Sequence, residues 1–417
     1  MKRLSHNSLN TETKVLSGID RVILPLRQTD GSSLQAIVSR EQKIERGEVI
    51  AETQEAGQAR LHSPLSGEVT TVFQTIAHDG ESVFAVEIRG DVDAPEKKMD
   101  PITGEISALS PEAIRARLEE AGVGPLGGNG TNTLYASLSH EDVPPEMLIV
   151  LCADEEPRLQ TQSHVLREMP GEVIEGATLL QKASGAGRLV FAVRKDRKEF
   201  VSGETLLVGK RYPSALPEIL MARATGKYAL REDRPRKDVH VINAETAAAA
   251  SMAVREGLPV LDKLVTVGLD GMESDLIRAP LGTPFSGLLK EAGLSAGNSD
   301  RLFTGGPMRG RAQFNIEAPL TKGVDSLFLQ KGRKVFLFHD VACIGCGACV
   351  RICPMKIQVD MMTRNCEYSR IAEAVDYDLE SCVECGLCGY VCTARRPLLQ
   401  YILFAKKEKQ KSERIDE

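Results

Sequence analysis

Eight cysteines near the end of the chain form two runs with the same spacing. The runs are Cys343-x2-Cys346-x2-Cys349-x3-Cys353 and Cys382-x2-Cys385-x2-Cys388-x3-Cys392. Three thiolates at three-residue steps can wrap a loop around one four-iron cluster, and small residues such as Gly345 and Gly386 allow a close approach. The spacing therefore predicts two 4Fe-4S clusters with these cysteines as ligands.

The fourth cysteine of each run is predicted to bind the cluster of the other run, as in the two-cluster ferredoxins of bacteria. Each fourth cysteine opens a helix that leads away from its own loop. On this logic the two ligand sets are Cys343, Cys346, Cys349 and Cys392, and Cys382, Cys385, Cys388 and Cys353. Two adjacent clusters without a substrate pocket of their own indicate one-electron relay.

A dense cysteine block can also bind structural zinc or form disulfides. Structural zinc commonly uses separated Cys-x2-Cys pairs, which a run of three plus one fits poorly. Disulfide frameworks spread their bridges through small secreted domains, whereas nine of the ten cysteines here lie between residues 343 and 392. The two cysteines outside the runs, Cys152 and Cys366, are predicted to be buried thiols without a ligand role.

Charge and composition exclude several classes of function. The 417 residues include 52 Lys and Arg against 58 Asp and Glu, and a net charge of −6 disfavours a nucleic-acid partner. Aromatic residues make up 4% and Trp is absent, so stacking platforms for single strands are not expected. No apolar run approaches the ~18 residues of a membrane span, and none follows residues 1–6 as in a signal peptide. We expect a soluble, cytoplasmic protein.

The chain is expected to be a multidomain α/β and α+β protein whose first unit is a β module. Residues 15–92 alternate short β-rich runs with tight turns at Gly47 and Gly67. This unit resembles the barrel-sandwich fold of biotinyl and lipoyl carriers. Residues 53–58 hold no lysine where a carrier would have its modified lysine. A structural or docking module is therefore preferred to a carrier.

Residues 110–237 are predicted to form an α/β domain. Ser110 and Pro111 are suited to cap and start a helix. Strands and helices then alternate, which indicates a parallel sheet covered by helices. The expected strands are residues 147–151 and 188–193, and the expected helices are residues 162–167 and 175–184.

Two further units complete the predicted organisation. Residues 238–325 are expected to form a small α+β, β-grasp-like module, and residues 335–405 a helical, ferredoxin-like domain with two clusters. Residues 406–411, a mixed-charge segment, are expected to form a solvated helix end. Arg395 and Arg396 either steer an acidic redox partner or belong to a solvated helix face.

With the cysteine runs placed after three such modules, residues 15–405 resemble the C subunit of the Rnf family. The shared motifs include His62-Ser63-Pro64-Leu65-Ser66-Gly67, Gly185-Ala186-Gly187, Gly282-Thr283-Pro284-Phe285, Gly305-Gly306-Pro307-Met308 and Cys392-Thr393-Ala394-Arg395-Arg396-Pro397-Leu398. Rnf complexes are membrane complexes that couple electron transfer between ferredoxin and an acceptor, usually NAD, to Na⁺ or H⁺ translocation. The resemblance implies an electron-transfer subunit of such a translocase, peripheral on the cytoplasmic face of the cell membrane. It implies other Rnf-type subunits and ferredoxin, or a similar iron-sulfur carrier, as partners.

The resemblance also implies a nucleotide site, which this sequence alters. In the family, and in the related flavin subunit of complex I, a Gly-Gly-Ala-Gly-Phe-Pro-Thr loop with a following lysine holds FMN and admits NADH. Here Thr131-Asn132 replaces Phe-Pro, Ala136 stands at the lysine position, and Ser214-Ala215-Leu216 replaces glycines. Gly127, Gly128, Gly130, Glu156 and Pro157 are retained. We expect an altered or lost NADH/FMN site, so that FMN is a disfavoured candidate cofactor beside the two clusters.

Three functions compete on this basis. The first is the Rnf-type electron-transfer subunit. The second is a soluble iron-sulfur flavoenzyme, such as a cobalamin-reductase-like protein, that acts alone. The third is a ferredoxin-like carrier or scaffold with an inactive nucleotide fold. Co-purification with hydrophobic subunits separates the first from the others, and a bound-flavin assay separates the second from the third.

Overall fold

Two small antiparallel sheets form the N-terminal barrel. The computed structural model describes residues 12–27, 33–53, 59–77, 80–91, 95–127, 144–226, 239–269, 274–334, 338 and 341–416. The sheets have the orders β2 (Arg21–Pro25), β8 (Ser82–Asp91), β7 (Ser66–Ile76), β4 (Lys43–Ile44), and β3 (Gln35–Ala36), β5 (Val49–Glu52), β6 (Leu61–His62). Apolar side chains such as Val22, Ile50 and Ile88 fill the interior. Most of the segment that lacks a carrier lysine, residues 54–58, falls outside the described residues.

A four-stranded parallel sheet forms the second unit, as the sequence predicted. Its order is β11 (Glu204–Val208), β10 (Arg188–Arg194), β9 (Met147–Leu151), β12 (Val239–Asn243). Because side chains alternate across a strand, Leu148 and Val150 face one layer of helices, while Ile149 and Leu151 face the other layer.

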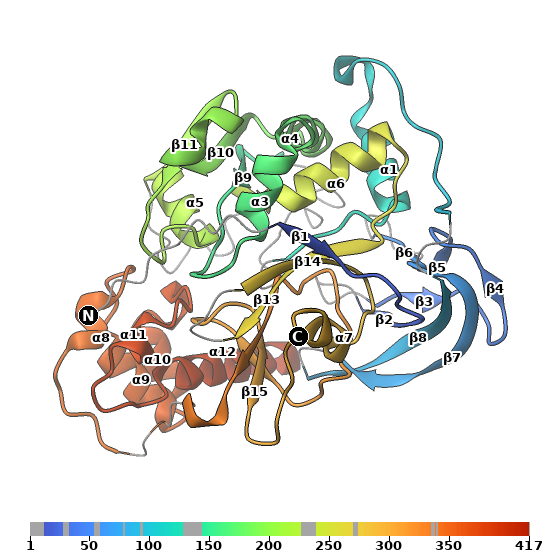
Figure 1. Ribbon diagram of the computed structural model, residues 1–417. Helices are drawn as coiled ribbons and strands as arrows, with labels where there is room; N and C mark the ends of the chain where they lie inside the picture. Colours follow the sequence, from blue (N-terminus) through green and yellow to red (C-terminus); the bar gives the residue numbers. More distant parts are fainter. Residues whose placement is uncertain are drawn as a thin grey trace.

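Helices cover both faces of this sheet (Figure 1). One layer holds α1 (Pro111–Glu120), α3 (Thr161–Glu168), α4 (Pro170–Ser184) and α6 (Ala244–Arg255), and the other holds α5 (Pro217–Thr225). Two 3-10 helices, η1 (Ile106–Ala108) and η2 (Lys195–Phe200), flank the layers. The predicted cap of α1 is present, because Ser110 Oγ accepts the N–H of Ala113 at 3.1 Å.

The α/β sheet continues past residue 237, the limit predicted from the sequence. β12 and α6 follow that limit, yet β12 pairs in parallel with β9, with Val239 opposite Met147. Asn243 ends β12 and caps α6 directly, since its side chain accepts the N–H of Thr246 at 2.9 Å. The strand and helix therefore form one β–α unit at the carboxyl edge of the sheet.

A six-stranded mixed sheet forms the third unit. Its order is β1 (Thr13–Val15), β14 (Ser274–Pro280), β13 (Asp262–Leu269), β17 (Ser326–Gln330), β15 (Arg301–Thr304), β16 (Arg311–Gln313). β13 and β17 are parallel neighbours, and β13 and β14 form an antiparallel hairpin. Helix α7 (Phe285–Glu291) packs Phe285 and Leu288 onto one face. β1 joins from the N-terminus and pairs in parallel with β14.

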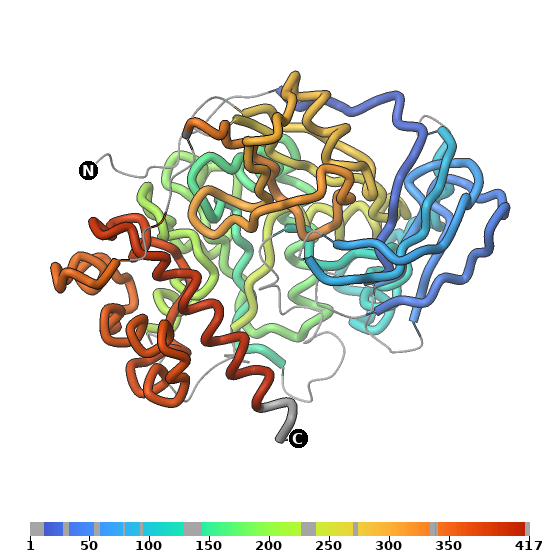
Figure 2. Tube along the Cα trace, turned by 90° about the horizontal axis from the view of Figure 1, so that it is seen from below, coloured from blue at the N-terminus to red at the C-terminus, as the bar shows by residue number. Residues whose placement is uncertain are grey.

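The cysteine-bearing unit is helical and lies at the opposite end of the molecule from the barrel (Figures 1 and 2). It contains α8 (Ala348–Ile352), α9 (Val359–Glu367), α10 (Ile371–Asp376), α11 (Leu387–Tyr390), α12 (Leu398–Asp416) and the 3-10 helix η4 (Leu379–Ser381). The 3-10 helix η3 (Gly332–Lys334) precedes this unit and packs against Ser299 of the third unit. Its core includes Met362, Leu379 and Ile402. None of the helices in the part of the chain described here is long and apolar enough to cross a membrane.

Candidate metal centres

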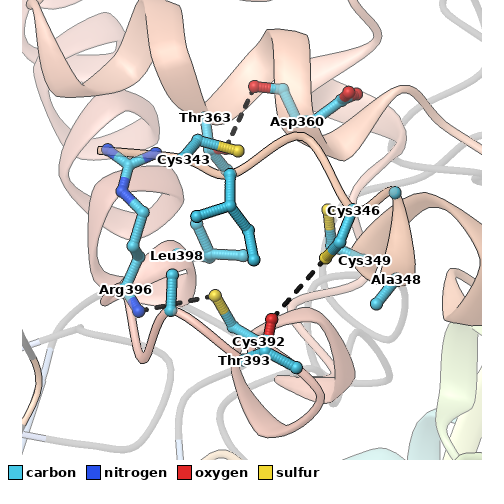
Figure 3. A pocket seen from close by; sticks show the side chains of 13 residues that line it. Cys343, Cys346, Ala348, Cys349, Asp360, Thr363, Cys392, Thr393, Arg396 and Leu398 are labelled. Atoms are coloured by element: carbon cyan, nitrogen blue, oxygen red, sulfur yellow. Dashed lines mark hydrogen bonds between the residues drawn. The ribbon is translucent and has the colours of Figure 1, made fainter. Parts of the chain in front are cut away.

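The first cysteine loop and the segment after α11 line one cavity (Figure 3). Its cysteines are Cys343, Cys346, Cys349 and Cys392. Cys349 lies in the short helix α8, whereas Cys392 follows α11. The last cysteine of the second run thus lies beside the first three of the first run.

The second cysteine loop lines a neighbouring cavity with the residue that ends α8. Its cysteines are Cys353, Cys382, Cys385 and Cys388. Most other lining residues are apolar; they include Pro354, Met355, Ile357, Leu387, Leu399 and Ile402. Each cavity is therefore lined by four thiols, which is the donor set of a 4Fe-4S cluster. Among the described residues, no three His, Cys, Asp or Glu side chains form a group that could hold a single metal ion.

The two cysteines outside the runs are buried, as predicted. Cys152 follows β9 in the core of the α/β domain, and Cys366 lies in α9 within the core of the cysteine-bearing unit. Burial raises the pKa of the Cys366 thiol to about 11. Neither residue lines either cavity.

The backbone of the second loop depends on Gly386. Its φ is +71°, in the left-handed region that favours glycine. A Cβ at this position would lie 2.5 Å from the carbonyl oxygen of Met308, in the turn between β15 and β16. The loop therefore packs its backbone directly against another unit of the chain.

The two cavities differ in their exposure. Cys343 and Cys346 are exposed, and Ile344 between them is 67% exposed. The amide of Ala348 and the hydroxyl of Thr393 lower the pKa of Cys346. In the second cavity, burial raises the pKa of Cys385 to about 12. The first cavity thus has two exposed cysteines, whereas every cysteine of the second cavity is buried or half-buried.

Arg396 fits neither of the two roles expected from the sequence. It is 4% exposed, forms an ion pair with Glu367, and its guanidinium lies 5.6 Å from the ring centre of Tyr401. It also lines the first cavity, where its backbone N–H points at Cys392 Sγ at 3.5 Å. Arg395 is exposed. The Arg-Arg pair is therefore split between a buried structural position and the surface.

Lys406 is a site residue that sequence reasoning missed. It was expected in a solvated helix end, but α12 continues to Asp416. Lys406 Nζ donates to the carbonyl oxygen of Cys382 and to Glu384 Oε1, both at 2.7 Å. The lysine holds the second cysteine loop against α12. No local pattern in a charged tail distinguishes such a lysine from its neighbours.

The carboxyl edge of the parallel sheet is where the resemblance implies a nucleotide. Of the altered glycine loop, Gly127 is described, while residues 128–136 lie outside the described residues. At the start of α6, the N–H of Thr246 donates to Asn243 Oδ1 at 2.9 Å, and the N–H of Glu245 donates to Gln162 Oε1 at 3.0 Å. These amides are the groups that bind a phosphate at a helix N-terminus, and here they already have side-chain partners.

An internal ion network adds negative charge at the same helix start. The buried ammonium of Lys263 pairs with Glu245 and lies 3.2 Å from Asp325 Oδ1. Asp325 in turn packs against Gly127, where a Cβ would lie 1.7 Å from its Oδ1. A phosphate here would have to displace Asn243 or Gln162 and would approach a carboxylate. In the described part of this edge, side chains of the chain itself therefore accept the first amides of α6.

Acidic residues directly after β9 hold the turn between β15 and β16. Glu156 is 2% exposed, and its Oε2 accepts the N–H groups of Met308 at 2.8 Å and Arg309 at 3.2 Å. Tyr212 donates its hydroxyl to the carbonyl oxygen of Cys385 at 2.7 Å. The α/β domain, the turn and the second cysteine loop therefore meet in one interface.

Three family models match the chain in the order of its units. The RnfC barrel sandwich hybrid domain matches residues 1–93, the Nuo51 FMN-binding domain matches residues 118–252, and the 4Fe-4S dicluster domain matches residues 342–395. These matches confirm the predicted barrel-sandwich, flavin-subunit-like and two-cluster units.

Curated relatives match over most of the chain. The C subunit of the ion-translocating oxidoreductase complex of Rhodobacter capsulatus is 28% identical over 404 residues, which cover 92% of this chain and 77% of the relative. The C subunit of the Na⁺-translocating ferredoxin:NAD⁺ oxidoreductase complex of Acetobacterium woodii is 24% identical, with coverage of 81% and 80%. For the corresponding protein of Pseudomonas aeruginosa, which is 29% identical, this chain spans 45% of the relative's length.

Among solved structures, a chain of an NAD⁺-reducing NiFe-hydrogenase in the H2-reduced state is similar to this chain. The match is 17% identical, covers 68% of this chain and 53% of that chain, and has a TM-score of 0.46.

Proposed function

Since this chain is a distant homologue of the C subunit of Rnf-type ion-translocating oxidoreductase complexes, we propose that it relays electrons in such a complex and does not itself use NADH. The observation that carries the relay is the division of eight cysteines into two neighbouring cavities of four. When bound, 4Fe-4S clusters supply one-electron transfer. Anaerobically purified protein should contain iron and sulfide for two clusters per chain. Iron for a single cluster would overturn the proposal.

The two ligand sets are crossed between the runs in this proposal. Cys343, Cys346, Cys349 and Cys392 hold the cluster of the first cavity. Cys382, Cys385, Cys388 and Cys353 hold the cluster of the second cavity. The support is the lining of each cavity, which combines three cysteines of one run with the fourth cysteine of the other.

The altered nucleotide site is the part of the proposal that departs from the relatives. Its support is the partnered amides at the start of α6, Glu245 beside them, and Ala136 at the position of a lysine. A phosphate that loses one charge-assisted contact loses about 1.5–3 kcal/mol, or about one to two decades of affinity. Electrons then pass between ferredoxin and another acceptor.

Anaerobic titration with NADH tests this part directly. We expect the visible absorbance of the cluster-replete protein to remain that of the oxidised state, and denaturation to release no stoichiometric FMN. Dithionite is the control, because it should bleach the same sample. Rapid bleaching by NADH, together with stoichiometric FMN, would show a working site.

We also propose that the chain is held at the cytoplasmic face of the membrane by its partner subunits. The support is the homology to subunits of membrane complexes. In membranes from the native host, high salt or a chaotrope should release the chain without detergent. Recovery after gentle lysis with no partner attached would favour the soluble iron-sulfur flavoenzyme instead.

The limits of the four units remain a proposal as well. We keep the barrel at 15–92 and the cysteine-bearing unit at 335–405, and extend the α/β domain to α6 because β12 pairs with β9. For the third unit, a β-grasp-like fold is supported by the strand order β14-β13-β17-β15-β16 with β13 and β17 parallel.

A further inference from the structure

Arg309 is a buried cation in the turn between β15 and β16. Its side chain is 7% exposed, and its Nη1 lies 3.5 Å from Glu155 Oε2. Burial alone would lower the pKa of Arg309, but the carboxylates of Glu218 and Glu155 hold it above its ordinary value. The guanidinium therefore carries a permanent positive charge inside the protein.

The turn that presents Arg309 is fixed on one side by the α/β domain. Glu156 accepts the backbone N–H groups of Met308 and Arg309. Gly306 packs onto the same side chain so closely that a Cβ would lie 2.1 Å from Glu156 Oε2. The position of Arg309 is thus set by backbone contacts as well as by its ion pair.

On its other side, the turn contacts the second cysteine loop. The Met308 carbonyl packs against Gly386. Tyr212, Leu216, Leu387 and Cys385 belong to one apolar cluster, against which Met308 packs. The hydroxyl of Tyr212 donates to the carbonyl oxygen of Cys385. These contacts join the loop that carries Cys385 to the turn that carries Arg309 in a largely buried, apolar cluster.

We propose that Arg309 sets the reduction potential of the cluster in the second cavity. Reduction adds one negative charge to a cluster, and a fixed cation in a dry environment stabilises that charge more strongly than it would in water. The residues around a metal centre commonly tune it in this way. Burial raises the pKa of Glu155 to about 8, so this carboxyl is an anion at pH 9. At that pH, removing the anion and removing the Arg309 cation change the local charge in opposite directions.

This inference rests on the proposed cluster of the second cavity, and its test is a pair of substitutions of opposite sign. Each variant is purified as the full chain with its clusters, and the two midpoint potentials are measured by EPR-monitored redox titration at pH 9, where Glu155 is ionised. Arg309→Met should lower the potential of the second-cavity cluster, Glu155→Gln should raise it, and Arg309→Lys should restore most of the wild-type value. The potential of the first-cavity cluster should stay within error.

A matched control is Arg255→Met, which removes an arginine of the α/β domain paired with Glu175 at 2.7 Å, on the helical layer. It should shift neither potential. If Arg309→Met fails to retain its clusters, Glu155→Gln and Arg309→Lys decide the question. Shifts of the same sign in Arg309→Met and Glu155→Gln, or no shift in Glu155→Gln, would overturn the role of Arg309. A wild-type protein with one cluster would instead overturn the proposed function, so the two failures are distinguishable.

Discussion

Cys353 and Cys392 each follow a run of three cysteines, yet each lines the cavity of the other run. The spacing alone predicts this exchange of ligands, which stays a prediction. In the structure Cys353 ends α8 and Cys392 follows α11, so neither opens a helix as the sequence analysis expected. The other groups at the loops were not predictable in the same way. Lys406 reaches the Cys382 carbonyl from α12, and Arg396 is buried through its ion pair with Glu367 of α9, so both positions depend on tertiary contacts.

Replacing the sulfur of Cys353 by oxygen tests which cluster this residue binds. Cys353→Ser should disturb the cluster of Cys382, Cys385 and Cys388 and leave the other EPR signal intact. Cys366→Ser is the matched control, because this thiol is buried in the same unit and lines neither cavity. Loss of the cluster of the first run in Cys353→Ser would show that the ligand sets are not crossed.

Burial of the His62 imidazole should make the free energy of unfolding depend on pH. His62 is buried in the barrel, its Nδ1 has no hydrogen-bond partner among the described residues, and burial lowers its pKa to about 3. Since the folded pKa lies below the unfolded value of about 6.5, the protein is stabilised above pH 6.5 and loses that contribution as the pH falls toward 3. Between pH 7 and pH 5 the loss is about 2 kcal/mol.

Denaturant unfolding of the full chain at both pH values measures this loss. His62→Gln does not titrate, so its stability should fall less between pH 7 and pH 5 than that of the wild type. The comparison cancels any effect of pH on the clusters, which both proteins share. An equal fall in both proteins would remove His62 as the cause.

At the scale of elements, local sequence patterns were sufficient to predict individual strands and helix caps. The buried run of residues 147–151 is strand β9, and Ser110 caps α1. The same patterns did not predict which strands pair when they are far apart in the sequence. β1 pairs with β14 across about 260 residues of chain, and β12 pairs with β9 beyond the predicted end of the domain. Nothing in a three- to five-residue strand specifies a partner so far away, because hydrophobic runs of that length fit many neighbours.

At the carboxyl edge of the parallel sheet, too, some features were predictable from the sequence and others were not. The substitutions at Thr131-Asn132 and Ala136 were visible in the sequence. The partner of the Glu245 amide was not, because Gln162 lies on α3, more than 80 residues earlier. When a side chain from another element accepts the first N–H groups of a helix, the sequence of that helix gives no sign of it.

Gly386 gives a prediction for the second cysteine loop as an element. Gly386→Ala places a Cβ in the left-handed region, at a cost of roughly 1–2 kcal/mol, and against the Met308 carbonyl at 2.5 Å. We expect a lower content of the second-cavity cluster and a lower thermal midpoint. Gly389→Ala is the control, since a Cβ there would meet no described atom within 4 Å. Equal cluster content in the two variants would show that the contact with Met308 is dispensable.

At the scale of the molecule, the two cavities differ in what lies next to them. The loop that lines the second cavity packs against the turn of Met308 and against Tyr212 of the α/β domain. The first cavity belongs to the cysteine-bearing unit, which lies at the opposite end of the molecule from the barrel (Figures 1 and 2), and Ile344 in its lining is 67% exposed. A protein partner that exchanges electrons with this chain can therefore approach the first cavity most closely.

Reversing the charge of Arg351 tests whether a redox partner approaches the first cavity. Arg351 is exposed, and its Nη1 lies 3.0 Å from the place where a Cβ of Gly347 would be, in the first cysteine loop. For an acidic iron-sulfur donor, Arg351→Glu should lower the second-order rate constant of reduction roughly two- to tenfold at low ionic strength, because steering by charge acts on encounter. Added salt should diminish the difference, since exposed charges are screened.

The control is Arg40→Glu, on the barrel, where the side chain is 75% exposed. This variant changes the net charge equally and should leave the rate constant near that of the wild type. Stopped-flow mixing under anaerobic conditions measures all three proteins, and an equal slowing in both variants would mean that net charge, and not the face around the first cavity, governs the encounter.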